Sequence, residues 1–352
     1  MASPRTAESR VPALADDIEG EERAAHLEAT CRRLQRQLAD SQAKTADLVG
    51  AVYRGARDAA LVCGVAGAVP APTKDRRQPR GETALLHLTD THVGAKTESY
   101  NTEVAYRRIR ETIAKTIRLT EIQRADHPVR DCVLLLGGDL IEQTGQFPNQ
   151  AWAVTGSTFA QIFDASKVIH EAILSLLGHF ENVTVYEVPG NHGRVGRGKG
   201  RQSLDYETET NWDRIIGRVI RDQLAGQARL HWHDAETWYH VAAIGEYRFL
   251  VHHGDTIRGF GGNIPAYGIL RKHMSWQSGV MPKFHDAYLG HFHIPMSIPL
   301  PGGGRVFVTP SLVSDSSFAR EWMASTSVPS QRLHFIDGAG GRVSAEYLLW
   351  LD

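Results

Sequence analysis

The sequence predicts an α/β fold with two packed, mixed β-sheets, preceded by an N-terminal helical arm. Apolar, β-rich runs alternate with helical stretches from residue 83 onward, and strand-like runs become closely spaced after residue 229. Residues 16–63 are rich in Ala, Leu, Glu, Arg and Gln and contain no proline. We therefore expect a helical arm over residues 1–63, a linker over 64–82 and a large domain over 83–352.

Composition places the chain among ordinary globular proteins. Its 352 residues allow one large domain with an appendage or two domains, and hydrophobic residues, at 42%, suffice for a sizeable core. Lys and Arg total 39 against 40 Asp and Glu, so the net charge of −1 gives no general attraction to nucleic acid or membranes. Any such binding has to come from a local patch.

The cysteines and the start of the chain indicate the cytoplasm. Cys31, Cys63 and Cys132 are odd in number and widely spaced, so they form neither a disulfide framework nor a CxxC metal pair. Residues 1–17 lack the apolar core of a signal peptide, and no apolar run is long enough to cross a membrane. We expect a cytoplasmic protein without membrane contact.

The arm carries a heptad seam. Its positions are separated by alternating steps of four and three: Leu27, Cys31, Leu34, Leu38, Ser41, Thr45, Leu48 and Val52. Three interpretations stay open: a helix packed on its own domain, a short coiled coil that makes a homo-oligomer, and a disordered segment. The linker that follows contains Gly, Pro, Lys74 and three arginines, and its charge is either merely solvated or a nucleic-acid contact.

Three strands and two helices open the large domain. The strands are expected at 83–89, 131–137 and 182–189 and the helices at 103–124 and 157–180, an order that favours parallel pairing. A third helix is expected at 207–224. Seven strands follow at 229–233, 238–243, 247–252, 287–290, 305–308, 332–336 and 343–350. Their crowding predicts a second mixed sheet packed on the first.

Short motifs of metal-ligand type follow several of these strands. They are Asp90-Thr91-His92, Gly138-Asp139, Gly190-Asn191-His192, His252-His253-Gly254-Asp255 and Gly290-His291-Phe292-His293. Ligands in α/β sheets emerge at the carboxyl ends of strands, so these side chains should meet at one edge, where the glycines permit tight turns. Any one motif would more often be a turn or a lone polar group, but the series of Asp, His and Asn suits divalent Mn, Fe, Zn or Mg.

The series D-x-H, G-D, G-N-H, H-G and G-H-x-H resembles the calcineurin-like metallophosphoesterase superfamily over residues 83–352. The resemblance implies two packed mixed sheets flanked by helices, an αββα sandwich, with two divalent metal ions. We expect Mn²⁺, with Fe, Zn or Mg as alternatives. The implied ligands are Asp90, His92 and His293 for the first metal, Asn191, His253 and His291 for the second, and Asp139 as a bridge between both.

The resemblance gives His192 a catalytic role, as transition-state stabiliser or general acid, rather than a ligand role. The implied mechanism is attack on phosphorus by a hydroxide that bridges the two metals. Glu142 stands where the second motif often continues with an acidic or amide residue. His252 and His253 face opposite sides of a strand, so only one can be a ligand, and the family's ligand directly precedes the glycine. That selects His253.

Weaker signals bear on the substrate. The runs GNHGR, HGDTIRGFGGNIPAYGI and VPSQRLHFID resemble the phage-type and DNA-repair-exonuclease-like branch of the superfamily. The loop 193–201 (GRVGRGKGR) places four cations and four glycines beside the expected phosphate, with Arg194 as a candidate substrate-binding residue, although a solvated loop is the alternative. Trp212, Trp276 and Trp322 either stack on bases or belong to the core.

We therefore expect a nuclease or phosphodiesterase that acts on DNA. The alternative is a phosphatase or phosphodiesterase of the same superfamily for small molecules or phosphoproteins. An inactive scaffold is disfavoured because every ligand position holds a competent residue.

Overall fold

The computed structural model describes residues 11–62, 65–77, 81–145, 150–195, 210–234, 236–257, 265–314 and 328–351. The chain forms two compact units, Met1–Ala51 and Val52–Asp352. Helix α1 (Val11–Val62) provides the described part of the first unit and continues into the second. Three leucines of the heptad seam, Leu27, Leu34 and Leu48, are exposed in this single chain, and binding of a second copy there stays a prediction. No helix in the described ranges has the length and apolar character of a membrane span.

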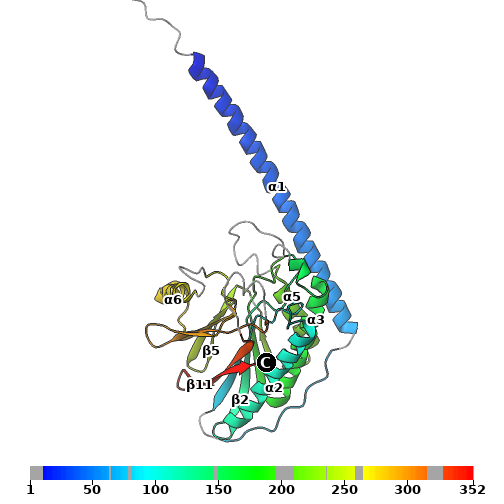
Figure 1. Cartoon of the computed structure of the whole chain (residues 1–352), viewed down its shortest axis with the longest axis vertical. Helices are drawn as coiled ribbons and strands as arrows, with labels where there is room; N and C mark the ends of the chain where they lie inside the picture. The colour runs from blue at the N-terminus through cyan, green and yellow to red at the C-terminus, as the bar shows by residue number, and fades with distance from the viewer. Residues whose placement is uncertain are drawn as a thin grey trace, which may run out of the picture. The chain divides into compact units, whose positions relative to one another are not determined.

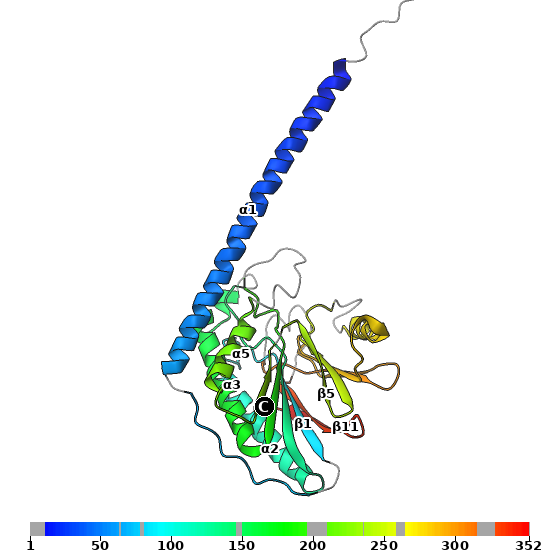
Figure 2. The ribbon, with the colours of Figure 1, turned by 180° about the vertical axis from the view of Figure 1, so that it is seen from behind.

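The first sheet has six strands in the order β11-β10-β1-β2-β3-β4. The strands are β1 (Glu82–Leu88), β2 (Val129–Leu136), β3 (Asn182–Glu187), β4 (Leu230–His233), β10 (Ser330–Asp337) and β11 (Arg342–Trp350). The first four pair in parallel, β10 is antiparallel to β1, and β11 is antiparallel to β10. Helices α2 (Thr102–Arg124), α3 (Thr158–His179) and α5 (Trp212–Gln223) lie together on one side of this sheet (Figures 1 and 2).

The second sheet has five strands in the order β5-β6-β7-β9-β8. They are β5 (Tyr239–Ile244), β6 (Tyr247–His252), β7 (Asp286–Leu289), β8 (Met296–Pro299) and β9 (Arg305–Val308). β6, β7 and β9 pair in parallel, and the two edge strands are antiparallel to their neighbours. Helix α6 (Ala266–Ser275), extended by a π-helical turn over Trp276–Val280, accompanies this sheet.

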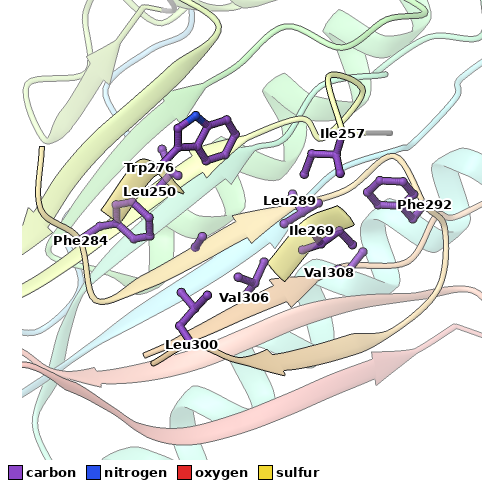
Figure 3. Close-up of a cluster of buried hydrophobic side chains, with 11 residues drawn as sticks. Leu250, Ile257, Ile269, Trp276, Phe284, Leu289, Phe292, Leu300, Val306 and Val308 are labelled. Carbon is purple, nitrogen blue, oxygen red and sulfur yellow. The ribbon is translucent and has the colours of Figure 1, made fainter. Parts of the chain in front are cut away.

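Alternation along β6 shows how the layers pack. Phe249 and Val251 are buried in one apolar cluster with Leu85 of β1, so they lie between the two sheets. Leu250, which points to the opposite face, packs in a second cluster with Trp276, and this cluster fills the space between the second sheet and α6 (Figure 3). The layers therefore run helices, sheet, sheet, helix.

The predicted α/β fold with two mixed, packed sheets flanked by helices is confirmed, but the sheet assignment needs correction. The strands expected at 229–233, 332–336 and 343–350 join the first sheet, as β4, β10 and β11, and not the second. Strand β8 and helix α6 were not expected. Periodicity shows that a strand exists, whereas its partner is fixed by contacts between distant segments, which the pattern does not encode.

Residues 65–77, part of the predicted linker, have no regular structure but belong to the second unit and are hydrogen-bonded to the rest of it. The Val69 N–H donates to Gln227 Oε1 at 3.0 Å, and the Arg130 guanidinium donates to the Asp75 carbonyl at 2.8 Å. Arg77 pairs with Asp75 at 2.7 Å, so one charge of the basic stretch is already engaged within it.

Candidate metal centre

The structure brings the predicted ligands together at the carboxyl ends of β1, β2, β3, β6 and β7. Among the residues that the structure describes, three groups have ligand atoms within 4.8 Å of one another: Asp90, His92 and His293; His92, Asp139 and His192; Asp139, His253 and His291. Asn191 joins the third group, because its Oδ1 lies 3.1 Å from Nε2 of His253. One cluster thus contains residues of all the sequence motifs.

The first half of the cluster is built around His92. Its Nε2 lies 3.2 Å from Nε2 of His293, which in turn lies 3.1 Å from Oδ1 of Asp90. Nδ1 of His92 lies 2.7 Å from a carboxylate oxygen of Glu142, which only accepts hydrogen bonds when ionised, so Nδ1 carries the proton. The lone pair of Nε2 therefore faces the cluster, as metal-ligating histidines are usually held.

The second half is built around His253. Its Nδ1 donates to the Gly137 carbonyl at 2.8 Å, which leaves the lone pair of Nε2 directed at Asp139 Oδ2, at 3.0 Å, and at Asn191 Oδ1. Burial lowers the pKa of His253, but the adjacent Asp139 carboxylate outweighs it and raises that pKa to about 10. Nε2 of His253 and the oxygens of Asp139 and Asn191 are all acceptors, and acceptors this close to one another repel unless a cation lies between them. When no metal is bound, a proton on Nε2 serves as that cation.

Asp139 connects the two halves. It belongs to both the group with His92 and the group with His253. Burial alone would raise the pKa of Asp139, but the imidazoles of His253 and His192 lower it below its ordinary range, so the carboxyl is anionic. The main-chain N–H of His192 also donates to Asp139 Oδ1 at 2.7 Å, which fixes the carboxylate. The cluster fits two metal ions.

The backbone of the cluster is strained. Apart from Gln143, the non-glycine residues with positive φ in the described ranges are Asp90 (50°), His92 (42°), Asp139 (52°), His291 (65°) and His293 (58°). Each such residue costs on the order of 1–3 kcal/mol, so the surrounding structure has to impose the conformation. The His92 N–H, for example, donates to the Asp139 carbonyl at 3.0 Å, which ties the first motif to the second. Strain of this kind concentrates at functional sites.

The motif glycines serve two different purposes. Gly138 has φ +87°, as the predicted tight turn requires. Gly190 and Gly290 need space instead: a Cβ on Gly190 would lie 2.1 Å from Asp139 Oδ1, and one on Gly290 would lie 1.9 Å from Asp90 Oδ2. At these two positions a Cβ would be obstructed, as predicted, and the atom that it would meet belongs to a carboxylate that approaches the backbone.

Asp213 supports the cluster and was missed by sequence reasoning. Its buried carboxylate accepts from the N–H groups of Asp139 (3.0 Å), Leu140 (3.0 Å) and Gly190 (2.8 Å), so it fastens the second and third motifs to each other. Burial, followed by the charge of Asp139, raises the pKa of Asp213 to about 6. Asn211, the N-cap of α5, donates to the Gly190 carbonyl at 2.8 Å. In the sequence, Asn211 and Asp213 stand at the start of an expected helix, and this pair is the signal that could have identified them.

His192 lies beside the first half. Its Nδ1 donates to the Glu142 carbonyl at 3.0 Å and lies 3.3 Å from the Glu142 carboxylate. Burial lowers the pKa of His192, but Asp139 and Glu142 outweigh it and raise the pKa. Gln150, also missed from the sequence, donates to Glu142 Oε1 at 2.8 Å. Because His192 shares a group with His92 and Asp139, distance alone would also allow it as a ligand.

Of the remaining predicted residues, some lie next to the cluster, some point away from it and some are outside the described ranges. Arg194 forms an ion pair with Asp255, so this candidate for substrate binding is held next to the fourth motif. Residues 196–201, the rest of the basic loop, lie outside the described ranges. His252 points away from the cluster, with its Nε2 3.0 Å from Nε2 of His273, which leaves His253 as the imidazole in the cluster.

The tryptophans considered as base-stacking residues do not fit that role where they are described. Trp212 and Trp276 are each only 6% exposed and belong to the packed interior, and Trp322 lies outside the described ranges.

No protein-family model matches the chain, and no curated protein matches it. Solved structures match at low identity. A Vps29 from Entamoeba histolytica is 14% identical with a TM-score of 0.33, over 76% of this chain and 99% of that one. A predicted phosphoesterase from Streptococcus pneumoniae TIGR4 is 10% identical with a TM-score of 0.28, over 76% and 98%. The purple acid phosphatase PPD1 from yellow lupin seeds is 12% identical with a TM-score of 0.34, over 80% and 55%.

Proposed function

We propose that this protein is a metal-dependent phosphodiesterase of the calcineurin-like kind that hydrolyses DNA. The observation that carries the proposal is the pair of acceptor clusters that share Asp139, each with an imidazole oriented from behind by a hydrogen bond at Nδ1. The residues that would hold the first metal are Asp90, His92, His293 and Asp139, and those for the second are Asn191, His253, His291 and Asp139. Divalent ions bound there would polarise the phosphoryl group and activate water, and Mn²⁺ is our first candidate.

The chain's own residues supply the rest of the chemistry. His192 is positioned by its Nδ1 contact to Glu142, so its other ring nitrogen can donate a hydrogen bond or a proton to the departing oxygen. Glu142 serves His92 and His192 at once, which keeps the two rings in a fixed mutual arrangement, with centroids 4.6 Å apart. Positioning of this kind is where much of the rate enhancement of such a site arises.

Charge favours a diester over a monoester substrate. A phosphomonoester brings two negative charges near neutral pH and needs additional cationic donors, whereas a diester brings one. In the part of the basic loop that the structure describes, the arginine next to the third motif, Arg194, already pairs with the Asp255 carboxylate. We therefore favour a nucleic-acid diester, with a small-molecule or phosphoprotein substrate as the second candidate.

Turnover on matched substrates tests the proposal. Metal-depleted protein would be reconstituted with Mn²⁺ and assayed on single-stranded DNA, plasmid DNA, bis-p-nitrophenyl phosphate and p-nitrophenyl phosphate. We expect both DNA and the chromogenic diester to be hydrolysed faster than the monoester, and Asp139→Asn to abolish all turnover. Faster hydrolysis of the monoester would favour the second candidate, and no metal-dependent hydrolysis of any substrate would contradict the proposal.

A further inference from the structure

One tryptophan differs sharply from the buried ones. Trp152 is 87% exposed, whereas Trp212 and Trp276 are each 6% exposed. An indole is a large apolar group that proteins usually cover, so an uncovered one beside a candidate active site requires a reason. We propose that Trp152 is a stacking platform for a nucleobase of the substrate next to the scissile phosphate. This inference rests on the proposed phosphodiesterase function and adds that the substrate bears an unpaired base.

The position of Trp152 is tied to the catalytic histidine on one flank. It ends the short 3₁₀ turn Gln150–Trp152, and Gln150 begins that turn. The Gln150 side chain donates to Glu142 Oε1 at 2.8 Å, and its nitrogen lies 3.4 Å from His192 Nδ1. Trp152 thus lies two residues from a side chain that touches the catalytic pair.

The other flank is tied to the first motif. The Ala153 carbonyl accepts from the Lys96 N–H at 2.9 Å, and the Thr155 N–H donates to the Gly94 carbonyl at 2.6 Å. The segment that contains Gly94 and Lys96 directly follows His92 in the sequence. The backbone around Trp152 is therefore held on both sides by segments of the metal cluster, and a fixed platform loses little conformational freedom when a ligand binds.

The surroundings fit a nucleobase better than a protein partner. In the sequence, Trp152 is followed by the exposed, small or polar residues Ala153, Thr155 and Ser157, and the next exposed aromatic residue of the described chain is Phe159 in α3. Lys96 is exposed on the paired segment and adds a positive charge where a backbone phosphate would pass. An aromatic face with a nearby cation is the usual combination in sites for single-stranded nucleic acid.

A dinucleotide with a single cleavable bond gives the sharpest test. The substrates would be thymidylyl-thymidine and its analogue in which tetrahydrofuran spacers replace both bases. Base stacking is worth about 1–3 kcal/mol, so Trp152→Ala should raise the KM for the dinucleotide by roughly 5- to 150-fold with little change in kcat. Trp152→Phe should retain most of the affinity. Neither variant should change turnover of the abasic analogue.

The matched control is Phe163→Ala. Phe163 is an exposed aromatic residue of α3 (45% exposed), two positions from Gln161, whose side chain accepts from the Gln143 N–H. Two helical steps rotate by about 200°, so Phe163 lies on the face of α3 that is turned away from the site loops. We expect this variant to behave like the wild type on both substrates.

Several outcomes would overturn the inference. Equal KM values for wild type and Trp152→Ala would remove the stacking role, and equal losses on the base-bearing and abasic substrates would make Trp152 a structural residue of its loop. Failure of the proposed function is separate, because it would appear as absent wild-type turnover of bis-p-nitrophenyl phosphate. In that case anisotropy of a fluorescein-labelled oligothymidylate decides: unchanged binding by Trp152→Ala, or no binding by the wild type, also contradicts the inference.

Discussion

The two halves of the metal cluster hold their central histidines by different means. His92 donates its Nδ1 proton to a side chain, the Glu142 carboxylate, whereas His253 donates to a main-chain carbonyl, that of Gly137. Burial is the same in both halves: the side chains of His92 and His253 are 2% and 1% exposed. Each half also has one half-buried histidine, His293 in the first and His291 in the second. The halves therefore differ in the partner of the central histidine and not in exposure.

This difference assigns the halves different tasks. The Gly137 carbonyl, which directly follows β2, accepts from His253, so the second half is anchored to the main chain at the end of a strand. Glu142 contacts both His92 and His192, so the first half is coupled to the residue that we propose acts on the leaving oxygen. We expect changes at the first half to affect metal affinity and catalysis together. We expect changes at Asp139 to weaken metal binding in both halves.

The largest effect is expected for Asp139→Asn. Asparagine keeps the shape but removes the charge shared by both halves, so both metals should bind more weakly, by more than the about 10–100-fold that hydrogen-bond partners of ligands contribute. Titration calorimetry with Mn²⁺ would measure this. Asp131→Asn, at the opposite end of β2, is the control and should bind metal normally. Loss at only one half would show that Asp139 does not bridge.

His192→Gln should slow turnover about 10²–10⁴-fold, the usual contribution of general acid–base help. Metal affinity in both halves should stay at the wild-type level, because we assign His192 to the leaving group. Steady-state kinetics and elemental analysis of the same preparation check both statements. A loss of bound metal would instead make His192 a ligand, which its distance to His92 and Asp139 permits.

Glu142→Ala should separate the halves. Without the carboxylate, His92 loses its orienting partner, and the first metal should bind about 10–100-fold more weakly while the second is unchanged. Two-site analysis of the Mn²⁺ titration gives the separate affinities, and Glu98→Ala, at an exposed position, is the control. Equal weakening of both sites would contradict the assignment of Glu142 to one half.

The smallest effect on the site is expected from the helical arm. If the heptad seam of α1 joins two copies, Leu34→Lys should convert a dimer to a monomer, because it places a charge in the seam. Light scattering measures the mass, and the Mn²⁺ titration of this variant should match the wild type in both halves. A wild-type protein that is already monomeric would contradict the coiled coil and favour a helix that acts within a single chain.

Much of the site could be predicted from the sequence because its ligands follow strands. An apolar run marks a strand, and polar residues such as Asp90 and Asp139 at its end are delivered to the same edge by parallel pairing. Alternation within a strand likewise separated His252 from His253. These features depend on neighbouring residues in the chain, which is why a pattern reveals them.

What the sequence did not reveal depends on distant segments. Asp213 accepts from three N–H groups only because the second and third motifs fold against the start of α5. Strand β10 joins β1 from the far end of the chain. The contrast between exposed Trp152 and buried Trp212 likewise arises from tertiary packing, since nothing in the local sequence distinguishes the two.

The most direct test of a two-metal phosphodiesterase counts the metal. Protein depleted with a chelator, reconstituted with Mn²⁺ and freed of excess metal would be measured by elemental analysis alongside its turnover of bis-p-nitrophenyl phosphate. We expect two equivalents of Mn²⁺ per chain and activity that rises with occupancy of the second equivalent. One equivalent or none, or hydrolysis that persists without metal, would contradict the assignment of these clusters.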